Sequence, residues 1–235
     1  MERWPELPYA AWKDTCATLQ LWTQIVGKTR LALTPWLNHS WHVTLYVTAR
    51  GLTTSLISGR TCDFETSFDF IDHVLVIRTS DGRTGAIALK PMTVADFFAA
   101  YRALLGDLAI DLQISGTPNE VIDAVPFATD TSHASYDPEY VSRFWHALLR
   151  SHEVFSWFRT GFLGKASPVH FFWGSFDLAV TRFSGRRAPL LAGGVPHLPD
   201  AVAQEAYSHE VSSAGFWPGG GAIEFPAYYS RLSRP

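Results

Sequence analysis

The chain has 235 residues, of which 14% are aromatic and only 17% are charged, with a net charge of -3. This length fits one domain with a sizeable core, and we expect a single globular domain over residues 1–235. No basic run is interleaved with aromatic residues, no window is long and apolar enough to span a bilayer, and the N-terminus lacks the pattern of a signal peptide. Cys16 and Cys62 form no CxxC motif and are expected to be reduced thiols. We therefore expect a cytoplasmic protein without a membrane or nucleic-acid partner.

The first half of the chain predicts a helix followed by antiparallel strands. Leu19, Trp22 and Val26 recur at helical spacing, which predicts a helix over 9–28 that ends near Gly27. Alternation of apolar and polar residues predicts strands at 41–48, 52–58 and 62–70. The turn residues at 80–82 predict a hairpin between 73–79 and 83–89. Thr93 is the expected N-cap of a helix over 93–105.

The second half repeats the order of helix and then strands. A short strand is expected at 111–115, and the irregular stretch 117–135 is expected to cross the surface or to close over a pocket. Asp137 and Pro138 open a predicted helix that extends to residue 162. Strands are predicted at 169–183, 208–216 and 222–229, with a loop at 193–196 and a short helix starting near 198–200.

These elements predict an α+β fold. We expect a largely antiparallel sheet whose face is covered by three main helices at 9–28, 93–105 and 137–162. The pattern of helix and then strands in both halves also permits a pseudo-duplicated architecture.

The segment 169–187 is the first place to look for a functional site. It sets polar residues within an aromatic and aliphatic run, where they are costly unless they are paired or used. His170 and Asp177 are the candidate acid–base pair. Strict alternation places them on opposite faces of a strand, whereas a bulge at Gly174 would bring them to one face. The sequence leaves that choice open.

His209 is the second candidate acid–base residue, and its neighbour Glu210 points the other way in a strand. A metal site is an alternative that would use His170, Asp177, His209 and Glu210 as ligands. These residues lack the close spacing of known metal motifs, and the more usual role of such side chains is in satisfied polar pairs. The cofactor is left unknown.

The remaining candidates are predicted to bind a substrate. Trp41, His42, Trp173, Ser175 and Trp217 are expected to line an aromatic pocket. Arg182 and Arg186 are expected to anchor an anionic group, against the alternative that they belong to a solvated basic turn.

Four stretches of the chain resemble a mainly bacterial family known as domain of unknown function 5996. They are WPELPYAAWKDTCATLQLWTQIVGKTRLA, WHVTLYVTARGLTTSLI, SPVHFFWGSFDLAVTRFSGRRAP and YSHEVSSAGFWPGGG. The resemblance spans nearly the whole chain and implies one cytoplasmic domain, but no activity. It also implies that family members usually continue beyond the Gly-rich turn at 218–221, which leaves open whether this chain lacks a C-terminal element of the family.

The sequence as a whole favours a protein that acts on a small, anionic organic molecule by His and Asp acid–base chemistry. Three alternatives stay open: a binding module without catalysis, a homodimer whose interface uses the aromatic residues, and a metal-dependent enzyme. The sequence does not decide whether the protein is an enzyme, and it names no substrate.

Overall fold

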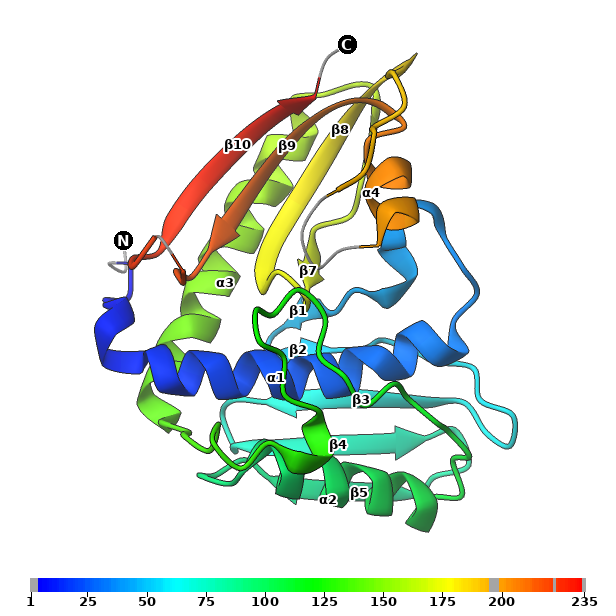
Figure 1. Cartoon of the computed structure of the whole chain (residues 1–235), viewed down its shortest axis with the longest axis vertical. Helices are drawn as coiled ribbons and strands as arrows, with labels where there is room; N and C mark the ends of the chain where they lie inside the picture. The colour runs from blue at the N-terminus through cyan, green and yellow to red at the C-terminus, as the bar shows by residue number, and fades with distance from the viewer. Residues whose placement is uncertain (1–3, 195–198, 222, 234–235) are drawn as a thin grey trace.

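The computed structural model of the protein describes residues 4–194, 199–221 and 223–233 (Figure 1). The predicted loop at 193–196, the predicted helix start near residue 198 and the first residue of the predicted strand at 222–229 therefore extend outside the described residues. The described part is an α+β fold with two antiparallel sheets, as the sequence predicts, although one sheet was expected. None of its helices is long and apolar enough to cross a membrane.

Helix α1 (Tyr9–Leu33) lies across the middle of the molecule and is largely buried (Figure 1). It continues past Gly27, so the predicted end at Lys28 is wrong. A Cβ atom at Gly27 would lie 2.3 Å from the indole of Trp173. Glycine at this position therefore allows Trp173 to pack on the helix backbone, and it does not mark a helix end.

The first sheet follows α1 and contains β1 (Tyr46–Thr48), β2 (Gly51–Thr53), β3 (Phe64–Asp69), β4 (Val74–Thr79) and β5 (Thr84–Ala88), in that order. In β3, Phe64, Thr66 and Phe68 are buried and alternate with half-buried residues, which confirms the predicted period of two. The β4–β5 hairpin is also confirmed.

Helix α2 (Val94–Asp107) packs beside α1, where Phe97 stacks on Trp22. The Thr93 hydroxyl accepts a hydrogen bond from the Asp96 amide, which confirms the predicted N-cap. After α2, residues 111–115 form no strand, and the predicted strand there is wrong. The irregular segment continues through a short 3-10 helix, η2 (Phe127–Thr129), to α3 (Pro138–Thr160), which begins at Pro138 as predicted.

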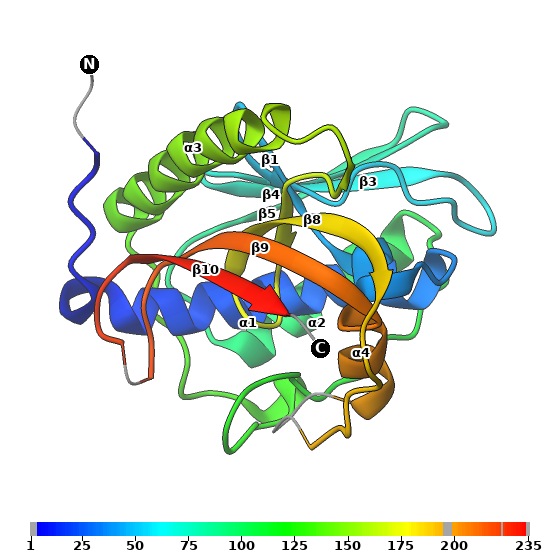
Figure 2. The same ribbon diagram turned by 90° about the horizontal axis from the view of Figure 1, so that it is seen from above.

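The second sheet has the strand order β10-β9-β8-β6, with β7 also paired to β8. Its strands are β6 (Lys165–Ala166), β7 (His170–Phe172), β8 (Asp177–Arg187), β9 (His209–Trp217) and β10 (Ala227–Ser233), and helix α4 (Asp200–Ala206) precedes β9. Figure 2 shows that this sheet curves, with α3 on its convex side and α4 on its concave side. The late strands predicted at 208–216 and 222–229 correspond to β9 and β10.

The predicted single strand over 169–183 is wrong, because the chain turns back between β7 and β8. Phe176 has a φ of 59°, and its amide donates to the Phe172 carbonyl at 2.8 Å. In the resulting hairpin, His170 lies opposite Ala179 and Phe172 lies opposite Asp177. Directly opposed residues share a face of a sheet, so His170 and Asp177 lie on the same face.

The two sheets meet where the residue before β1 bonds with β7. The amide and carbonyl of Leu45 exchange hydrogen bonds of 2.9 Å each with those of Phe171. Residues 41–45 precede this contact and were predicted to be strand. Instead, Asn38–Val43 forms a short 3-10 segment, η1, in which His39 and Ser40 have left-handed backbone angles. This turn brings His39 and Trp41 toward the concave face of the second sheet.

Candidate functional site

Buried polar atoms that form no hydrogen bond mark positions where the protein itself does not supply a partner. Among the described residues, the ionisable side chains with such atoms are Arg159, His170, Arg182 and Glu205. None of them belongs to the first sheet. Since a buried polar group without a partner is costly, these positions are the first candidates for a bound ligand.

His170 is buried on the concave face, with 2% of its surface exposed. Its Nδ1 lies 2.9 Å from the Thr44 hydroxyl oxygen, which in turn lies 3.1 Å from the Trp41 carbonyl oxygen. When Thr44 donates its one proton to that carbonyl, His170 must donate from Nδ1. Nε2 then carries a lone pair, and it has no partner among the described residues.

Two guanidinium groups act on this histidine. Arg30 donates from Nε to the His42 carbonyl at 2.8 Å and also donates to the Thr54 carbonyl, and it lies over the Tyr46 ring. Arg159 has a buried Nε without a partner in the described part of the chain. Neither arginine forms an ion pair with a carboxylate of the described residues. We call Arg30, Arg159 and His170 the basic cluster.

The electrostatics of the basic cluster keep His170 neutral. Burial, followed by the nearby charges of Arg30 and Arg159, lowers the pKa of His170 to about 4. The cluster therefore holds two cations and one neutral imidazole at neutral pH. Such an arrangement attracts an anion and offers it one hydrogen-bond acceptor on Nε2.

Aromatic rings extend from the basic cluster along the concave face. The Trp41 ring lies 5.4 Å from that of His170, and the His39 ring lies 5.3 Å from that of Trp41. Phe183 contacts both His39 and Trp41, and Tyr46 lies 5.6 Å from His170. Trp41, Tyr46, Phe183 and Arg159 are half-buried.

Asp177 shares the face of His170 but has other partners. It accepts hydrogen bonds from the hydroxyl groups of Ser175 and Tyr229, and burial raises its pKa. Thr44, rather than Asp177, contacts the imidazole. The two predicted acid–base residues are therefore neighbours on one face without forming a pair.

The other predicted site residues lie in several places. His42 faces Trp36 and bonds the backbone of Leu37, while Trp173 donates from Nε1 to the Val43 carbonyl at 2.7 Å. Trp217 is half-buried at the end of β9, and its ring approaches Gly220. Of these three, His42 contacts the basic cluster, through its carbonyl, which accepts from Arg30.

The two predicted anion anchors have other partners, although Nε of Arg182 is buried without a hydrogen bond among the described residues. Arg182 stacks on Phe158 with 3.4 Å between the guanidinium carbon and the ring centre, and it donates to the Phe158 carbonyl at the end of α3. Arg186 forms an ion pair with Glu210 at 2.8 Å. Their contacts are those of a helix C-terminal cap and of an exposed turn.

The structure does not gather the four candidate metal ligands. His209 lies beside Ser208 and, after burial, contributes to the lowered pKa of His39. Glu210 pairs with Arg186, and His170 and Asp177 have the partners given above. In the described ranges, no three His, Cys, Asp or Glu side chains are arranged to hold a metal ion.

Sequence reasoning missed four residues that the fold makes conspicuous: Lys28, Arg30, Glu120 and Arg159. A signal was present for Lys28 and Arg30, because they are the only charged residues in the stretch 15–33 of α1. Glu120 and Arg159 carry no comparable signal in the sequence, and only the packing of distant segments distinguishes them.

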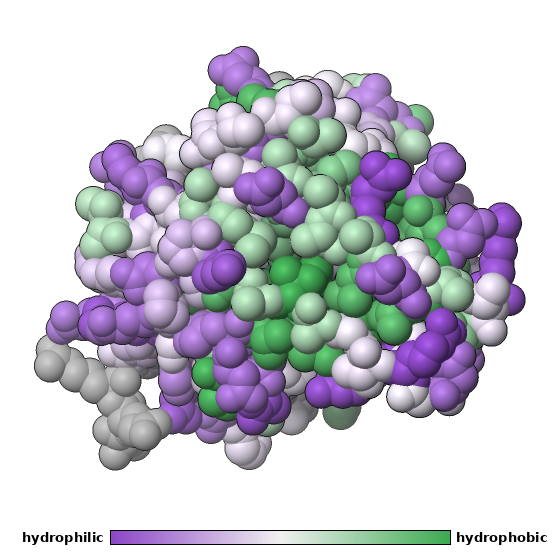
Figure 3. Space-filling model, turned by 90° about the horizontal axis from the view of Figure 1, so that it is seen from below, coloured by the Kyte–Doolittle hydropathy of each residue, from purple (hydrophilic) through white to green (hydrophobic). Residues whose placement is uncertain are grey.

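Two surface hollows lie away from these residues. One lies beside the end of α2, and the other lies beside the start of α1 near Tyr136 and Asp137. Figure 3, which views the molecule from the side of α2 and β5, shows apolar side chains gathered on that face. Neither hollow contains a predicted site residue.

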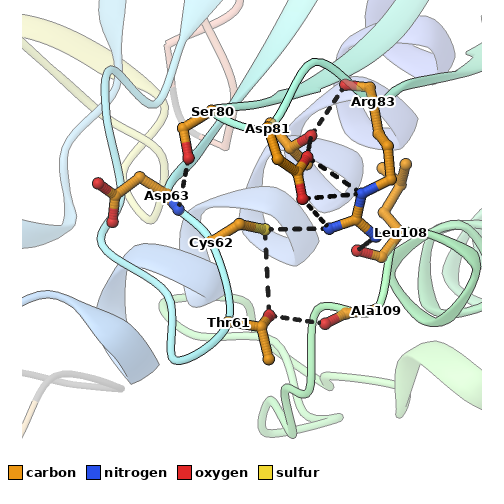
Figure 4. Close-up of polar contacts among 9 residues, drawn as sticks. Thr61, Cys62, Asp63, Ser80, Asp81, Arg83, Leu108 and Ala109 are labelled. Atoms are coloured by element: carbon orange, nitrogen blue, oxygen red, sulfur yellow. Dashed lines mark hydrogen bonds and ion pairs between the residues drawn. The ribbon is translucent and has the colours of Figure 1, made fainter.

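A further polar network is structural. Arg83 pairs with Asp81, donates to the Leu108 carbonyl and approaches Cys62 Sγ at 3.5 Å, while Thr61 donates to the Ala109 carbonyl (Figure 4). These bonds hold the segment after α2 against the β4–β5 hairpin, and Arg83 has its carboxylate partner.

The fold and site together define an α+β protein with two antiparallel sheets, in which a buried histidine on the concave face of the second sheet feels the charges of Arg30 from α1 and Arg159 from α3. Residues 4–233 match the profile of a family of unknown function, DUF5996, and the chain belongs to this family. The curated proteins gave no match, and neither did the solved structures.

Proposed function

We propose that the protein binds a small organic anion at the basic cluster. Two observations carry this proposal: His170 Nε2 and Arg159 Nε are buried without partners among the described residues, and His170 feels the charges of Arg30 and Arg159, neither of which has a carboxylate partner there. An anion bound there would supply the missing counter-charge and the missing hydrogen-bond partners.

The geometry also indicates the kind of anion. Arg159 suits a carboxylate or phosphate oxygen, whereas the lone pair on His170 Nε2 requires a donor. The favoured ligand is therefore an organic acid with a hydroxyl or similar donor beside its anionic group. The half-buried rings of Trp41 and Tyr46 would cover its apolar part.

Binding has stronger support than catalysis. A base with a pKa of about 4 removes protons poorly at neutral pH, because an effective general base titrates near the working pH. A bound anion would raise the pKa of His170 toward neutrality and make it a better base. Acid–base turnover by His170, with His209 and Asp177 outside the reacting contact, is therefore the second proposal.

Thermal unfolding at fixed ionic strength tests the proposal. We expect inorganic phosphate, glycolate and lactate to raise the melting temperature of the wild type above that in chloride, because a ligand that binds only the folded state stabilises it. Arg159→Gln should lose this increase. Arg186→Gln is the matched control, because Arg186 is an exposed arginine with its own carboxylate partner, and it should keep the increase.

Equal responses of Arg159→Gln and the wild type would contradict the proposal, as would the absence of any increase over chloride. Isothermal titration with the most effective anion then gives the stoichiometry, which we expect to be one per chain. Incubation of that complex in deuterated water distinguishes turnover from binding, since proton abstraction from carbon would exchange a ligand hydrogen for deuterium.

A further inference from the structure

Strand β10 forms the outer edge of the second sheet (Figure 1). All seven of its residues pair with β9, and no other described strand pairs with its outer side. Every second residue of an edge strand directs its backbone N–H and C=O groups away from the sheet, where another strand can pair with them. Within the described residues, the second sheet therefore ends in a row of backbone groups that can accept a further strand.

The other edge strands of the two sheets are shorter than β10. Strands β1, β5 and β6 have three, five and two residues. Soluble proteins keep edge strands short or place Lys, Pro or a bulge in them, because a long and regular edge pairs with other chains. The sequence of β10, AYYSRLS, contains neither Lys nor Pro, and its register with β9 is unbroken. Of these four edges, β10 is thus the one best suited to pair with another chain.

Exposed apolar side chains flank this edge on both faces of the sheet. Tyr228 contacts Phe155 on the α3 side, which Leu232 shares, and these two residues of β10 are 50% and 62% exposed. Trp4 packs edge-on against Tyr228, and Tyr229 lies on the concave side. The four exposed side chains present roughly 400 Å² per copy, since a whole aromatic side chain has about 150–250 Å². A stable interface buries about 800 Å² per partner, of which about 60% is non-polar, so this patch supplies most of the non-polar share.

The sequence of β10 is suited to pairing with a second copy of itself. Directly opposed residues share a face of a sheet, so two copies related by a twofold axis pair most fully when the axis passes through Ser230, the middle residue. Tyr228 of one copy then faces Leu232 of the other, and Tyr229 faces Arg231. The first of these pairs buries apolar surface. In the second, the one charged residue of the strand meets a tyrosine ring and not a second arginine.

We propose that β10 pairs antiparallel with β10 of a second copy, so that the second sheets of two chains form one continuous sheet in a symmetric dimer. The open backbone of the edge requires an extended strand as its partner. The register about Ser230 favours the identical strand, because it joins apolar residues and keeps the like charges apart. The proposal does not rest on anion binding, since no residue of the basic cluster lies in β10.

The mass of the full-length protein in solution tests the proposal. Light scattering coupled to size exclusion should give twice the chain mass of 26.2 kDa at micromolar concentration. Ser230→Lys should raise the dissociation constant of the dimer about 10-fold or more, because it places two like charges directly opposite each other. Ser58→Lys makes the same change at an exposed serine between β2 and β3, and it should keep the mass of the wild type.

Circular dichroism checks that both lysine variants are folded. A wild type that stays monomeric up to its solubility limit would overturn the proposal. So would a dimer whose dissociation constant is the same in Ser230→Lys as in the wild type, because its interface would lie elsewhere on the molecule.

Ser230→Cys tests the register directly. In the proposed pairing the two introduced thiols face each other within reach of a disulfide, so mild oxidation should link the chains into covalent dimers. The natural Cys16 and Cys62 are buried. Ser58→Cys is the matched control and should remain unlinked on a denaturing gel without reductant. Absence of the link in Ser230→Cys, or equal linkage of the two variants, would contradict the pairing of β10 with itself.

Discussion

The charged residues around the two sheets differ in whether they have ion-pair partners. In the first sheet, Arg50 pairs with Asp69 and Asp72, and Arg83 pairs with Asp81, all at the surface or its edge. In contrast, Arg30 and Lys28 of α1 and Arg159 of α3 have no carboxylate partner among the described residues, and Nε2 of His170 in the second sheet has no hydrogen-bond partner there.

This contrast separates the region that we expect to contribute stability from the region that we propose to bind a ligand. Paired surface charges cost little to keep, whereas buried cations without partners persist only where other packing tolerates them or a ligand completes them. We therefore assign the first sheet to stability and the concave side of the second sheet to binding. Four predictions sharpen this division, from the largest effect to the smallest.

Phe68→Ala removes a fully buried ring from the first sheet and should cause the largest loss of stability. Phe68 has 1% of its surface exposed, and truncation of a buried Phe costs about 3–5 kcal/mol. Denaturant unfolding measures this change. The increase in melting temperature caused by the anion should persist in this variant, and its loss would show that the two regions are not separate.

His170→Gln should change how stability depends on pH. Because the folded pKa of His170 is lowered to about 4 from its ordinary value of 6.5, its contribution is complete above pH 6.5 and is lost as the pH falls through 4. Between about pH 7 and pH 4, the wild type should lose roughly 3 kcal/mol more than the variant. Parallel curves for the two proteins would contradict the buried, neutral state of His170.

Glu120→Gln should act in the opposite direction over an overlapping pH range. The folded pKa of Glu120 is raised from 4.5 to about 7, so its contribution is present below pH 4.5 and is lost as the pH rises through 7. The variant should therefore lose less stability than the wild type when the pH is raised across this range. Denaturant unfolding at several pH values measures the difference, with Asp123→Asn as the control that should behave like the wild type.

Arg186→Ala should have the smallest effect. The side chain of Arg186 is 79% exposed, and exposed ion pairs contribute at most about 1 kcal/mol. Denaturant unfolding should show a change within this limit. A larger loss, or the loss of anion binding, would restore Arg186 as an anchor and move the site away from the basic cluster.

The sequence predicts the elements whose signals are local. The alternation in β3, the Thr93 cap and the Asp137-Pro138 helix start each depend on neighbouring residues, and all three are confirmed. The β7–β8 hairpin was missed because Phe176, rather than a glycine, adopts the left-handed backbone angle. Gly27 predicts a helix end, but the helix continues through it. A glycine stands there because the indole of Trp173, distant in the sequence, packs against the helix backbone.

The candidate site could be predicted only in part. His170 and Asp177 were singled out because they stand in an apolar run, and both are buried on one face of the sheet. Their partners were not foreseeable, since Thr44 and Tyr229 lie 126 and 52 residues away in the chain. The uncompensated charge of Arg159 is likewise a property of packing, because no local pattern shows that a helix-end arginine will lack a carboxylate.

The most direct test of the binding site is a nuclear magnetic resonance titration of His170, first in chloride and then with saturating phosphate. We predict an imidazole that titrates near pH 4 in chloride and at a distinctly higher pH with phosphate, because the anion stabilises the imidazolium. A pKa near the ordinary value of 6.5 in chloride, or one that phosphate leaves unchanged, would contradict an anion site at the basic cluster.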